Sequence, residues 1–180
     1  MLSYIYAKKE SAMILTEEFF SQSAISVAPE LVGKLLCRDI GGEVIKRRIV
    51  ETECYFGEED TACHAHKGRT PRTDIMYRRG GRAYIYLCYG IHELLNVTTG
   101  PDGHPEAVLI RGVEGAIGPG RATKLMRIDR TLNKMPLVRE SGIWIEDDGF
   151  VPKIESMKRI GIGYASQEDQ DRLWRYVLKS

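Results

Sequence analysis

The alternation of hydrophobic and polar positions predicts several β-strands in the middle of the chain. The clearest covers residues 83–89, a stretch rich in aromatic and aliphatic side chains that ends at Gly90. Further strands are predicted over residues 43–55, 94–98, 107–111 and 143–146, and Gly41-Gly42 marks a turn before the first of these. Several successive strands without helices between them favour antiparallel pairing.

Short helices are predicted on either side of these strands. Residues 29–36 begin with Pro29 and place leucine and valine residues at helical spacing. Thr16 is a suitable N-cap for a helix at the start of the globular pattern. Another helix is predicted over residues 121–126, directly after a Gly-Pro-Gly sequence. The sequence therefore predicts an α+β fold, with one twisted, mainly antiparallel sheet flanked by short helices.

Length and composition favour a single domain. The chain has 180 residues, of which 43% are hydrophobic and 28% charged, values that are ordinary for a soluble globular protein. We expect the domain to cover residues 13–180 and residues 1–12 to form a flexible N-terminal extension. No apolar run approaches ~18 residues, and no secretion signal is evident, so we expect a cytoplasmic protein without membrane contact.

Basic side chains are concentrated in the long connection over residues 56–82. The formal net charge of +1 does not by itself indicate nucleic-acid binding. Between residues 67 and 82 of this connection, however, one acid stands against six bases: Asp74 against Lys67, Arg69, Arg72, Arg78, Arg79 and Arg82. Taken alone, this segment is most simply a solvated basic loop, although connections of this length are often functional.

The four cysteines form no Cys-x-x-Cys pair, so we expect reduced, mostly buried thiols. Cys63 does lie beside His64, His66 and Asp60, a combination that allows a metal-dependent hydrolase as an alternative. The spacing of these residues matches no strong zinc signature. The chain also lacks a P-loop and a Gly-x-Ser-x-Gly nucleophile motif, which disfavours phosphoryl transfer and serine hydrolysis.

Residues 49–55 carry the best candidates for catalytic chemistry. If this segment is extended, Ile49, Glu51, Glu53 and Tyr55 share one face of the strand. A carboxylate can activate water for attack on a sugar carbon, and a neighbouring arginine such as Arg111 would keep that carboxylate ionised. Periodicity does not choose between the two glutamates, and structural ion pairing is an equally good explanation of either.

Aromatic rings near these carboxylates could hold a flat substrate. The candidates are Tyr55, Tyr84, Tyr86 and Tyr89, because a ring stacked on a nucleobase contributes ~1–3 kcal/mol. Strand parity places Tyr84 and Tyr86 on one face and Tyr89 on the other. A tyrosine-rich strand is more often part of a plain core, so the rings alone do not establish a base-binding site.

Taken together, ordered motifs from about Leu15 to the C-terminus resemble the alkyladenine (3-methyladenine) DNA glycosylase family that includes the human enzyme. The motifs lie at residues 48–55, 68–72, 84–90, 95–97, 108–111 and 118–120. Each one is weak alone, but the ordered set is specific. Two positions depart from the family pattern: Cys54 stands where alanine is common, and Ile91 where methionine is common.

The resemblance implies a monofunctional enzyme of base excision repair. It would flip alkylated or otherwise damaged purines, such as 3-methyladenine, out of duplex DNA and hydrolyse the N-glycosidic bond, leaving an abasic site. Glu53 would be the general base for the attacking water. Arg111 would hold that water and the carboxylate, and the backbone near Ile160 would complete the water site. No cofactor and no metal are implied.

The resemblance also assigns substrate contacts. Tyr55, His64 and Tyr86 would enclose the flipped base, with His64 also hydrogen-bonding to it, and Asn96 would help to exclude guanine. Tyr89, next to Ile91, would wedge into the minor groove. Contacts to DNA phosphates would come from Arg69, Thr70 and Arg72. The expected partner is double-stranded DNA containing damaged purines, bound by a monomer, in the nucleoid of a bacterium or the nucleus of a eukaryote. The family fold is a single mixed domain built on a curved antiparallel sheet.

Overall fold

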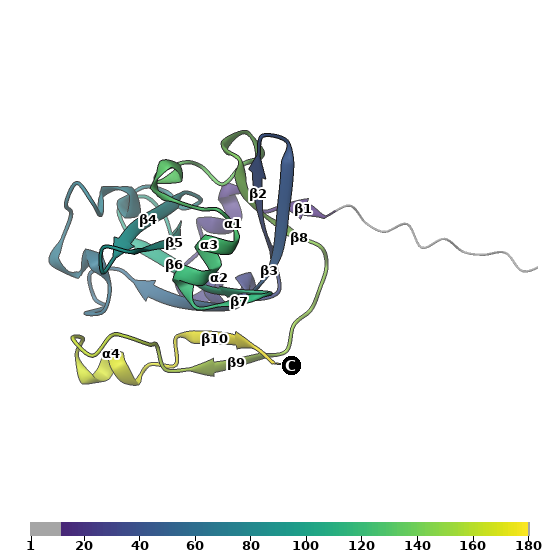
Figure 1. Cartoon of the computed structure of the whole chain (residues 1–180). Coiled ribbons are helices and arrows are strands. Elements are labelled where there is room, and N and C mark those ends of the chain that lie inside the picture. Colours follow the sequence, from purple (N-terminus) through teal and green to yellow (C-terminus); the bar gives the residue numbers. More distant parts are fainter. Residues whose placement is uncertain (1–11, 180) are drawn as a thin grey trace, which may run out of the picture.

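An antiparallel sheet of ten strands organises the computed structural model, which describes residues 12–179 (Figure 1). The N-terminal extension expected over residues 1–12 therefore lies, apart from Ala12, outside the described residues. The predicted α+β domain with an antiparallel sheet is confirmed. No helix within residues 12–179 is long and apolar enough to cross a membrane.

The main path through the sheet does not follow the order of the chain. From edge to edge it runs β1 (Met13–Ile14), β8 (Ile143–Asp147), β2 (Leu35–Ile40), β3 (Glu43–Phe56), β6 (Glu106–Val113), β5 (His92–Thr99) and β4 (Ala83–Cys88). Off this path, β7 (Ala116–Ile117) pairs with β6, and β10 (Arg175–Leu178) pairs with both β3 and β9 (Ile154–Met157). The long strand β3 thus joins the two ends of the sheet.

Short helices complete the described part of the chain. The α-helices are α1 (Glu17–Phe20), α2 (Ala24–Leu31), α3 (Pro119–Leu125) and α4 (Gln167–Asp171). The 3₁₀ helices are η1 (His64–Lys67), η2 (Asp74–Tyr77), η3 (Arg130–Leu132) and η4 (Arg139–Ser141). The predicted N-cap at Thr16 precedes α1 as expected, and the helix predicted over residues 121–126 corresponds to α3.

The two faces of the sheet formed by strands β3 to β6 pack against different parts of the protein. On one face, aliphatic side chains such as Ile85, Val97 and Ile110 join the main core, which α2 and α3 cover. Burial of each such side chain contributes about 1.5–3 kcal/mol. On the other face, Tyr84 and Ala107 belong to a second, smaller cluster formed with the connection between β3 and β4. Alternation along the strands therefore separates the core from the face that bears the candidate site.

The helix predicted over residues 29–36 is wrong. Helix α2 begins earlier, where the Ser23 hydroxyl accepts a hydrogen bond from the Ile25 amide, and Pro29 lies inside it. The chain then turns at Gly33, whose φ of +92° suits glycine, and residues 35–40 form strand β2 between β3 and β8. Leu35 and Leu36, which suggested helical spacing, instead belong to this strand, which pairs with β3 on one side and with β8 on the other.

Two register shifts between β3 and β6 alter the predicted side-chain parity. They lie between Ile49 and Thr52, and they leave Arg111 of β6 without a directly opposite partner. Ile49 consequently packs in the main core and not on the face of Glu51 as predicted. Figure 1 shows β3 bending as it passes from its pairing with β2 to its pairing with β6. Bulges of this kind bend strands and redirect side chains near functional sites.

The C-terminal arm, residues 154–178, lies against the far edge of β3 (Figure 1). Strand β10 pairs Arg175 with Glu53 and Val177 with Glu51, while β6 pairs with the same part of β3 from the other side. The arm is also tied down by Arg159, whose guanidinium makes two hydrogen bonds of 2.6 and 2.9 Å to Asp60. Both edges of the Glu51–Glu53 segment are therefore covered.

We predict that Gly80→Ala destabilises the fold. A Cβ atom at this position would collide with the Phe20 carbonyl oxygen and lie 2.7 Å from Thr99 Cα, both of them backbone atoms. Overpacking of this kind should cost about 2 kcal/mol or more. Gly163→Ala is the control, because nothing lies within 4 Å of the place that its Cβ atom would occupy and its φ is not positive. The denaturant concentration at the midpoint of unfolding should fall for Gly80→Ala only. Equal midpoints for the two variants would contradict the close packing around Gly80.

Candidate active site

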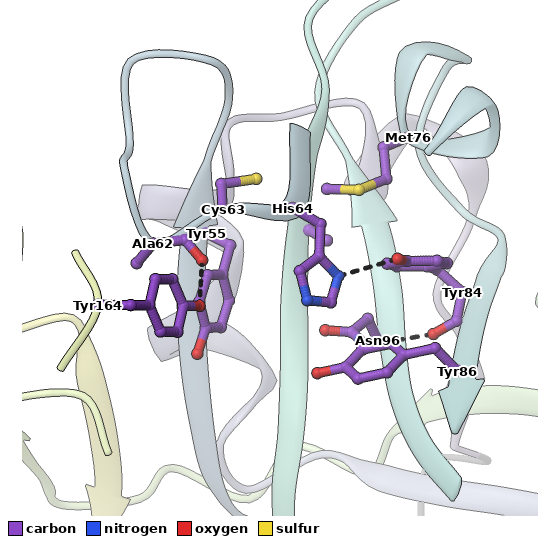
Figure 2. Close-up of a pocket in the computed structure, with 10 residues that line it drawn as sticks. Tyr55, Ala62, Cys63, His64, Met76, Tyr84, Tyr86, Asn96 and Tyr164 are labelled. Atoms are coloured by element: carbon purple, nitrogen blue, oxygen red, sulfur yellow. Dashed lines mark hydrogen bonds between the residues drawn. The ribbon is translucent and has the colours of Figure 1, made fainter. Parts of the chain in front are cut away.

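A pocket opens on the face of the sheet that bears the second cluster (Figure 2). It encloses about 320 Å³, including the part open to solvent. Its lining comes from β3, β4, β5, β6, the connection after β3 and the C-terminal arm: Tyr55, Ala62, Cys63, His64, Met76, Tyr84, Tyr86, Asn96, Ala107 and Tyr164. All four residues predicted to enclose or border a base are brought together here.

Aromatic side chains form two opposed walls of the pocket. Figure 2 shows Tyr55 and Tyr164 on one side of a gap and His64 with Tyr86 on the other. The imidazole of His64 packs edge-on against Tyr86, with ring centroids 4.7 Å apart. Such walls suit a flat, conjugated ring, because every base offers a π-face for stacking.

Glu53 is hydrogen-bonded to the hydroxyl of Tyr55 in the pocket wall. Its side chain has no exposed surface, yet both carboxylate oxygens are hydrogen-bonded: Tyr55 Oη donates to Oε2 at 2.9 Å, and the Ile160 amide donates to Oε1 at 2.8 Å. Arg111 Nε lies 3.6 Å from Oε1. The carboxylate does not line the cavity itself, and the Tyr55 hydroxyl connects it to the pocket wall.

The environment of Glu53 favours proton uptake. Burial raises the pKa of this carboxyl above its ordinary value, and Arg111, the Ile160 amide and the Tyr55 hydroxyl offset the effect only in part. A carboxylate whose pKa is raised is a stronger base, which matches the requirement for a group that removes a proton from water.

Glu51 has a different environment from Glu53. Its Oε1 accepts hydrogen bonds from Arg111 Nε and from Arg175 Nη1, each at 3.1 Å, and it is absent from the pocket lining. The two glutamates that periodicity left open thus differ: Glu51 is held by two arginines, whereas Glu53 is hydrogen-bonded to Tyr55, which lines the pocket. Arg175 was not identified from the sequence, because only strand pairing across 124 positions brings it to Glu51.

Arg159 is a second residue that the sequence did not single out. Its side chain is fully buried, donates to the Cys54 carbonyl at 2.9 Å and pairs with Asp60. The guanidinium also lies 5.0 Å from the ring centroid of Tyr55 and 5.1 Å from that of Trp174. These contacts therefore fix the backbone that leads into Ile160. The only sequence signal was an arginine placed among glycines and isoleucines.

His64 is held at the pocket by Tyr84. His64 Nδ1 and Tyr84 Oη lie 2.9 Å apart, and the Asn96 side-chain amide donates to the Tyr84 carbonyl at 3.2 Å (Figure 2). Burial, assisted by the positive charge of Arg72, lowers the pKa of His64 to about 4. The imidazole is therefore neutral at physiological pH.

The residues predicted to contact DNA lie outside the pocket. Tyr89 and Ile91 are 91% and 72% exposed in the turn between β4 and β5, where Tyr89 has a φ of +51°. Tyr89 is thus a turn residue and does not continue the strand as predicted. Arg69 pairs with Asp74, and Thr70 bonds to Thr73. Arg72 donates a hydrogen bond to Tyr84 Oη and lies over the Tyr86 ring.

The candidate metal ligands do not come together in the described part of the chain. Within residues 12–179, no three histidine, cysteine, aspartate or glutamate side chains converge on one point. His66 Nδ1 lies 2.7 Å from the Glu58 carbonyl oxygen, away from His64, and Asp60 is occupied by Arg159. All four cysteines are free, and three are buried, as predicted.

Comparisons with known proteins agree with this arrangement. A sequence model of the family described as Methylpurine-DNA glycosylase (MPG) matches residues 18–117 and 114–180. A Psychrobacter cryohalolentis protein named "Putative 3-methyladenine DNA glycosylase" is 41% identical, over 95% of this chain and 94% of its own length. Proteins of the same name from Borrelia garinii subsp. bavariensis and Methanocella arvoryzae are 42% and 39% identical, over 89% and 93% of this chain. They are covered over 94% and 93% of their own lengths.

These matches define the class of the protein as a DNA glycosylase, a hydrolase that cleaves N-glycosyl bonds. Within that class, the chain belongs to the methylpurine-DNA glycosylase family. The family resemblance expected from the ordered motifs is therefore confirmed.

We predict that His64 titrates with a midpoint at about 4, because burial disfavours the imidazolium. Hydrogen bonds to Glu106 and Glu59 should move His104 the other way, outweighing its burial and raising its pKa above the ordinary value. Nuclear magnetic resonance titration of the four histidines would test this, with His64→Gln identifying the signal. A midpoint of 6 or higher would show that the His64 imidazole is more hydrated than its burial in this structure implies.

Proposed function

We propose that the protein flips alkylated or otherwise damaged purines, such as 3-methyladenine, out of duplex DNA and hydrolyses their N-glycosidic bond with an activated water. The observation that carries this proposal is Glu53, a fully buried carboxylate hydrogen-bonded to Tyr55 of the pocket wall. The product would be an abasic site in an intact strand, because none of the ten pocket-lining residues is a lysine that could form an imine.

Glu53 would act as the general base. When the bond breaks, the sugar carbon gains positive charge, which the carboxylate stabilises while it takes a proton from the attacking water. Arg111 would keep the carboxylate ionised and oriented, a role supported by its 3.6 Å distance from Oε1. The Ile160 backbone already donates to the same oxygen and would border the water site.

The aromatic walls would hold the extruded base. A base inside a duplex is unreachable, so the enzyme must unstack it at a cost of a few kcal/mol, least for damaged pairs. Stacking between Tyr55 and the His64–Tyr86 wall would recover part of that cost, and Asn96 would restrict the purines admitted. Cationic purines would be the easiest substrates, because they leave as neutral bases.

The exposed turn after β4 would fill the space that the base vacates. Tyr89 and Ile91 offer large hydrophobic side chains to solvent, which is unfavourable unless a partner covers them. Insertion of Tyr89 into the minor groove would offset the lost stacking. Arg69 and Thr70 would then lie on the DNA-facing surface and contact phosphates without reading sequence.

We predict that Glu53→Gln abolishes base release while DNA binding survives. Loss of a general base should reduce the rate by about 10²–10⁴-fold. Release of 3-methyladenine from alkylated duplex DNA would be measured in the presence of a chelator, together with binding to the same duplex. Wild-type activity that vanishes with the chelator would favour a metal-dependent reaction, and joint loss of binding and activity would point to a folding role.

Glu51→Gln provides the matched control, because Glu51 lies on the same strand but, within residues 12–179, its side chain bonds only to Arg111 and Arg175. This variant should retain activity within about tenfold of wild type, because the glutamine side-chain oxygen can still accept hydrogen bonds from both arginines. Equal losses in the two variants would contradict the separate roles of the glutamates.

We also predict the acid limb of the pH profile. Only the ionised carboxylate accepts a proton, and burial raises the pKa of Glu53, so the rate should fall as pH drops through a midpoint above 4.5. Arg111→Gln removes the strongest opposing effect and should move the midpoint to higher pH. Enzyme-free DNA would correct for acid depurination. A midpoint at or below 4.5, or one unmoved by Arg111→Gln, would contradict Glu53 as the base.

A further inference from the structure

Three side chains form a hydrogen-bonded path from the protein surface to the pocket. Arg72 is exposed at one end, and its Nε donates to Tyr84 Oη at 3.2 Å. Tyr84 Oη in turn lies 2.9 Å from His64 Nδ1. The guanidinium of Arg72 is also held in place over the Tyr86 ring, 4.9 Å from its centroid. Arg72 therefore contacts both Tyr84 and Tyr86, the two tyrosines that pack against His64.

The path has only one consistent arrangement of protons. A guanidinium can donate but not accept, so the Tyr84 oxygen is the acceptor in the bond from Arg72. Tyr84 is 2% exposed, and within residues 12–179 its hydroxyl has no other partner than Arg72 and His64. The phenolic proton must therefore go to His64 Nδ1, because otherwise it would be buried without an acceptor.

The neutral imidazole then carries its single proton on Nε2. This nitrogen makes no hydrogen bond to any described residue, and Figure 2 shows the imidazole directed into the gap between Tyr55 and Tyr86. We propose that Arg72 is a positioning residue that, through Tyr84, holds His64 as a hydrogen-bond donor to the base. This inference rests on the proposed function, since it presumes that a purine occupies the pocket.

A donor at this place favours one chemical class of substrate. When the N-glycosidic bond breaks, its electron pair moves onto the departing purine. A neutral purine such as hypoxanthine becomes anionic, and a donor to one of its lone pairs stabilises that charge. A cationic purine such as 3-methyladenine becomes neutral and needs this help less. Arg72 should therefore matter more for neutral lesions.

The protonation state of His64 can be measured without substrate. Long-range proton–nitrogen spectra of the full-length protein, labelled with ¹⁵N in histidine, distinguish the two tautomers at neutral pH. We expect an Nε2–H imidazole with an unprotonated, hydrogen-bonded Nδ1, and His64→Gln would identify its signals. In Arg72→Leu, water can take the place of the exposed guanidinium and accept the Tyr84 phenolic proton, so an Nδ1–H population should appear. Tyr84→Phe, which removes the hydroxyl, should abolish the signature of the hydrogen-bonded Nδ1.

Arg78→Leu is the control for this experiment, because Arg78 belongs to the same connection but, among the described residues, its side chain pairs only with Asp74. Its His64 spectrum should equal that of the wild type. An Nδ1–H imidazole in the wild type, or an unchanged tautomer in Arg72→Leu, would overturn the proposal. Thermal unfolding of each variant would establish that it is folded.

Base release adds a second readout. Arg72→Leu should lower kcat/KM for hypoxanthine release about three- to tenfold more than for 3-methyladenine, the size expected for one hydrogen bond. Equal losses on both lesions with an unchanged tautomer would instead assign Arg72 to phosphate binding. If the tautomer is as expected but no lesion is released, the proposed function fails while the path stands. Release that depends on Glu53 but not on the His64 tautomer would support the proposed function and contradict the role of Arg72.

Discussion

The burial of the Glu53 carboxylate is the constraint on which the candidate site depends. An ionisable carboxyl without exposed surface is costly unless its oxygens are hydrogen-bonded and a positive charge lies nearby. The Tyr55 hydroxyl and the Ile160 amide occupy its two oxygens, and Arg111 supplies the charge. These partners come from the same strand, from a neighbouring strand and from the C-terminal arm. The fold must assemble all three before the site exists.

The Arg159–Asp60 pair is the clearest example of how that assembly is secured. It joins the C-terminal arm to the connection after β3, and Arg159 precedes the residue that donates to Glu53. A buried ion pair contributes little net stability compared with well-packed hydrophobic residues, but breaking it leaves an unpaired buried charge. Its value here is positional, because the guanidinium also packs between Tyr55 and Trp174 and so orders the pocket wall.

The polar groups around the pocket divide into two sets with different electrostatics. Near the Tyr55 wall, ionised groups are gathered and paired: Glu51 with Arg111 and Arg175, and Asp60 with Arg159. On the His64 side the lining residues are uncharged, because burial keeps the imidazole neutral and the Arg72 guanidinium is not part of the lining. The Glu53 carboxyl therefore lies beside a pocket whose lining residues carry no formal charge. The proposed reaction needs both features, a carboxylate to take a proton from water and an uncharged aromatic pocket to hold a flat base.

The sequence by itself determined five of the ten strands that the structure describes, the α+β class and the family, because alternation, turn residues and ordered motifs are properties of neighbouring positions. Motif order also pointed to Glu53 before any geometry was known, and its role stays a prediction. Only the tertiary structure decided that residues 35–40 form a strand, that register shifts turn Ile49 to the core, and that Tyr89 lies in a turn. It alone revealed Arg159, Arg175 and the path from Arg72 to His64. These features depend on pairing between segments far apart in the chain, and no local pattern records which distant partner will satisfy a buried charge or hydrogen bond.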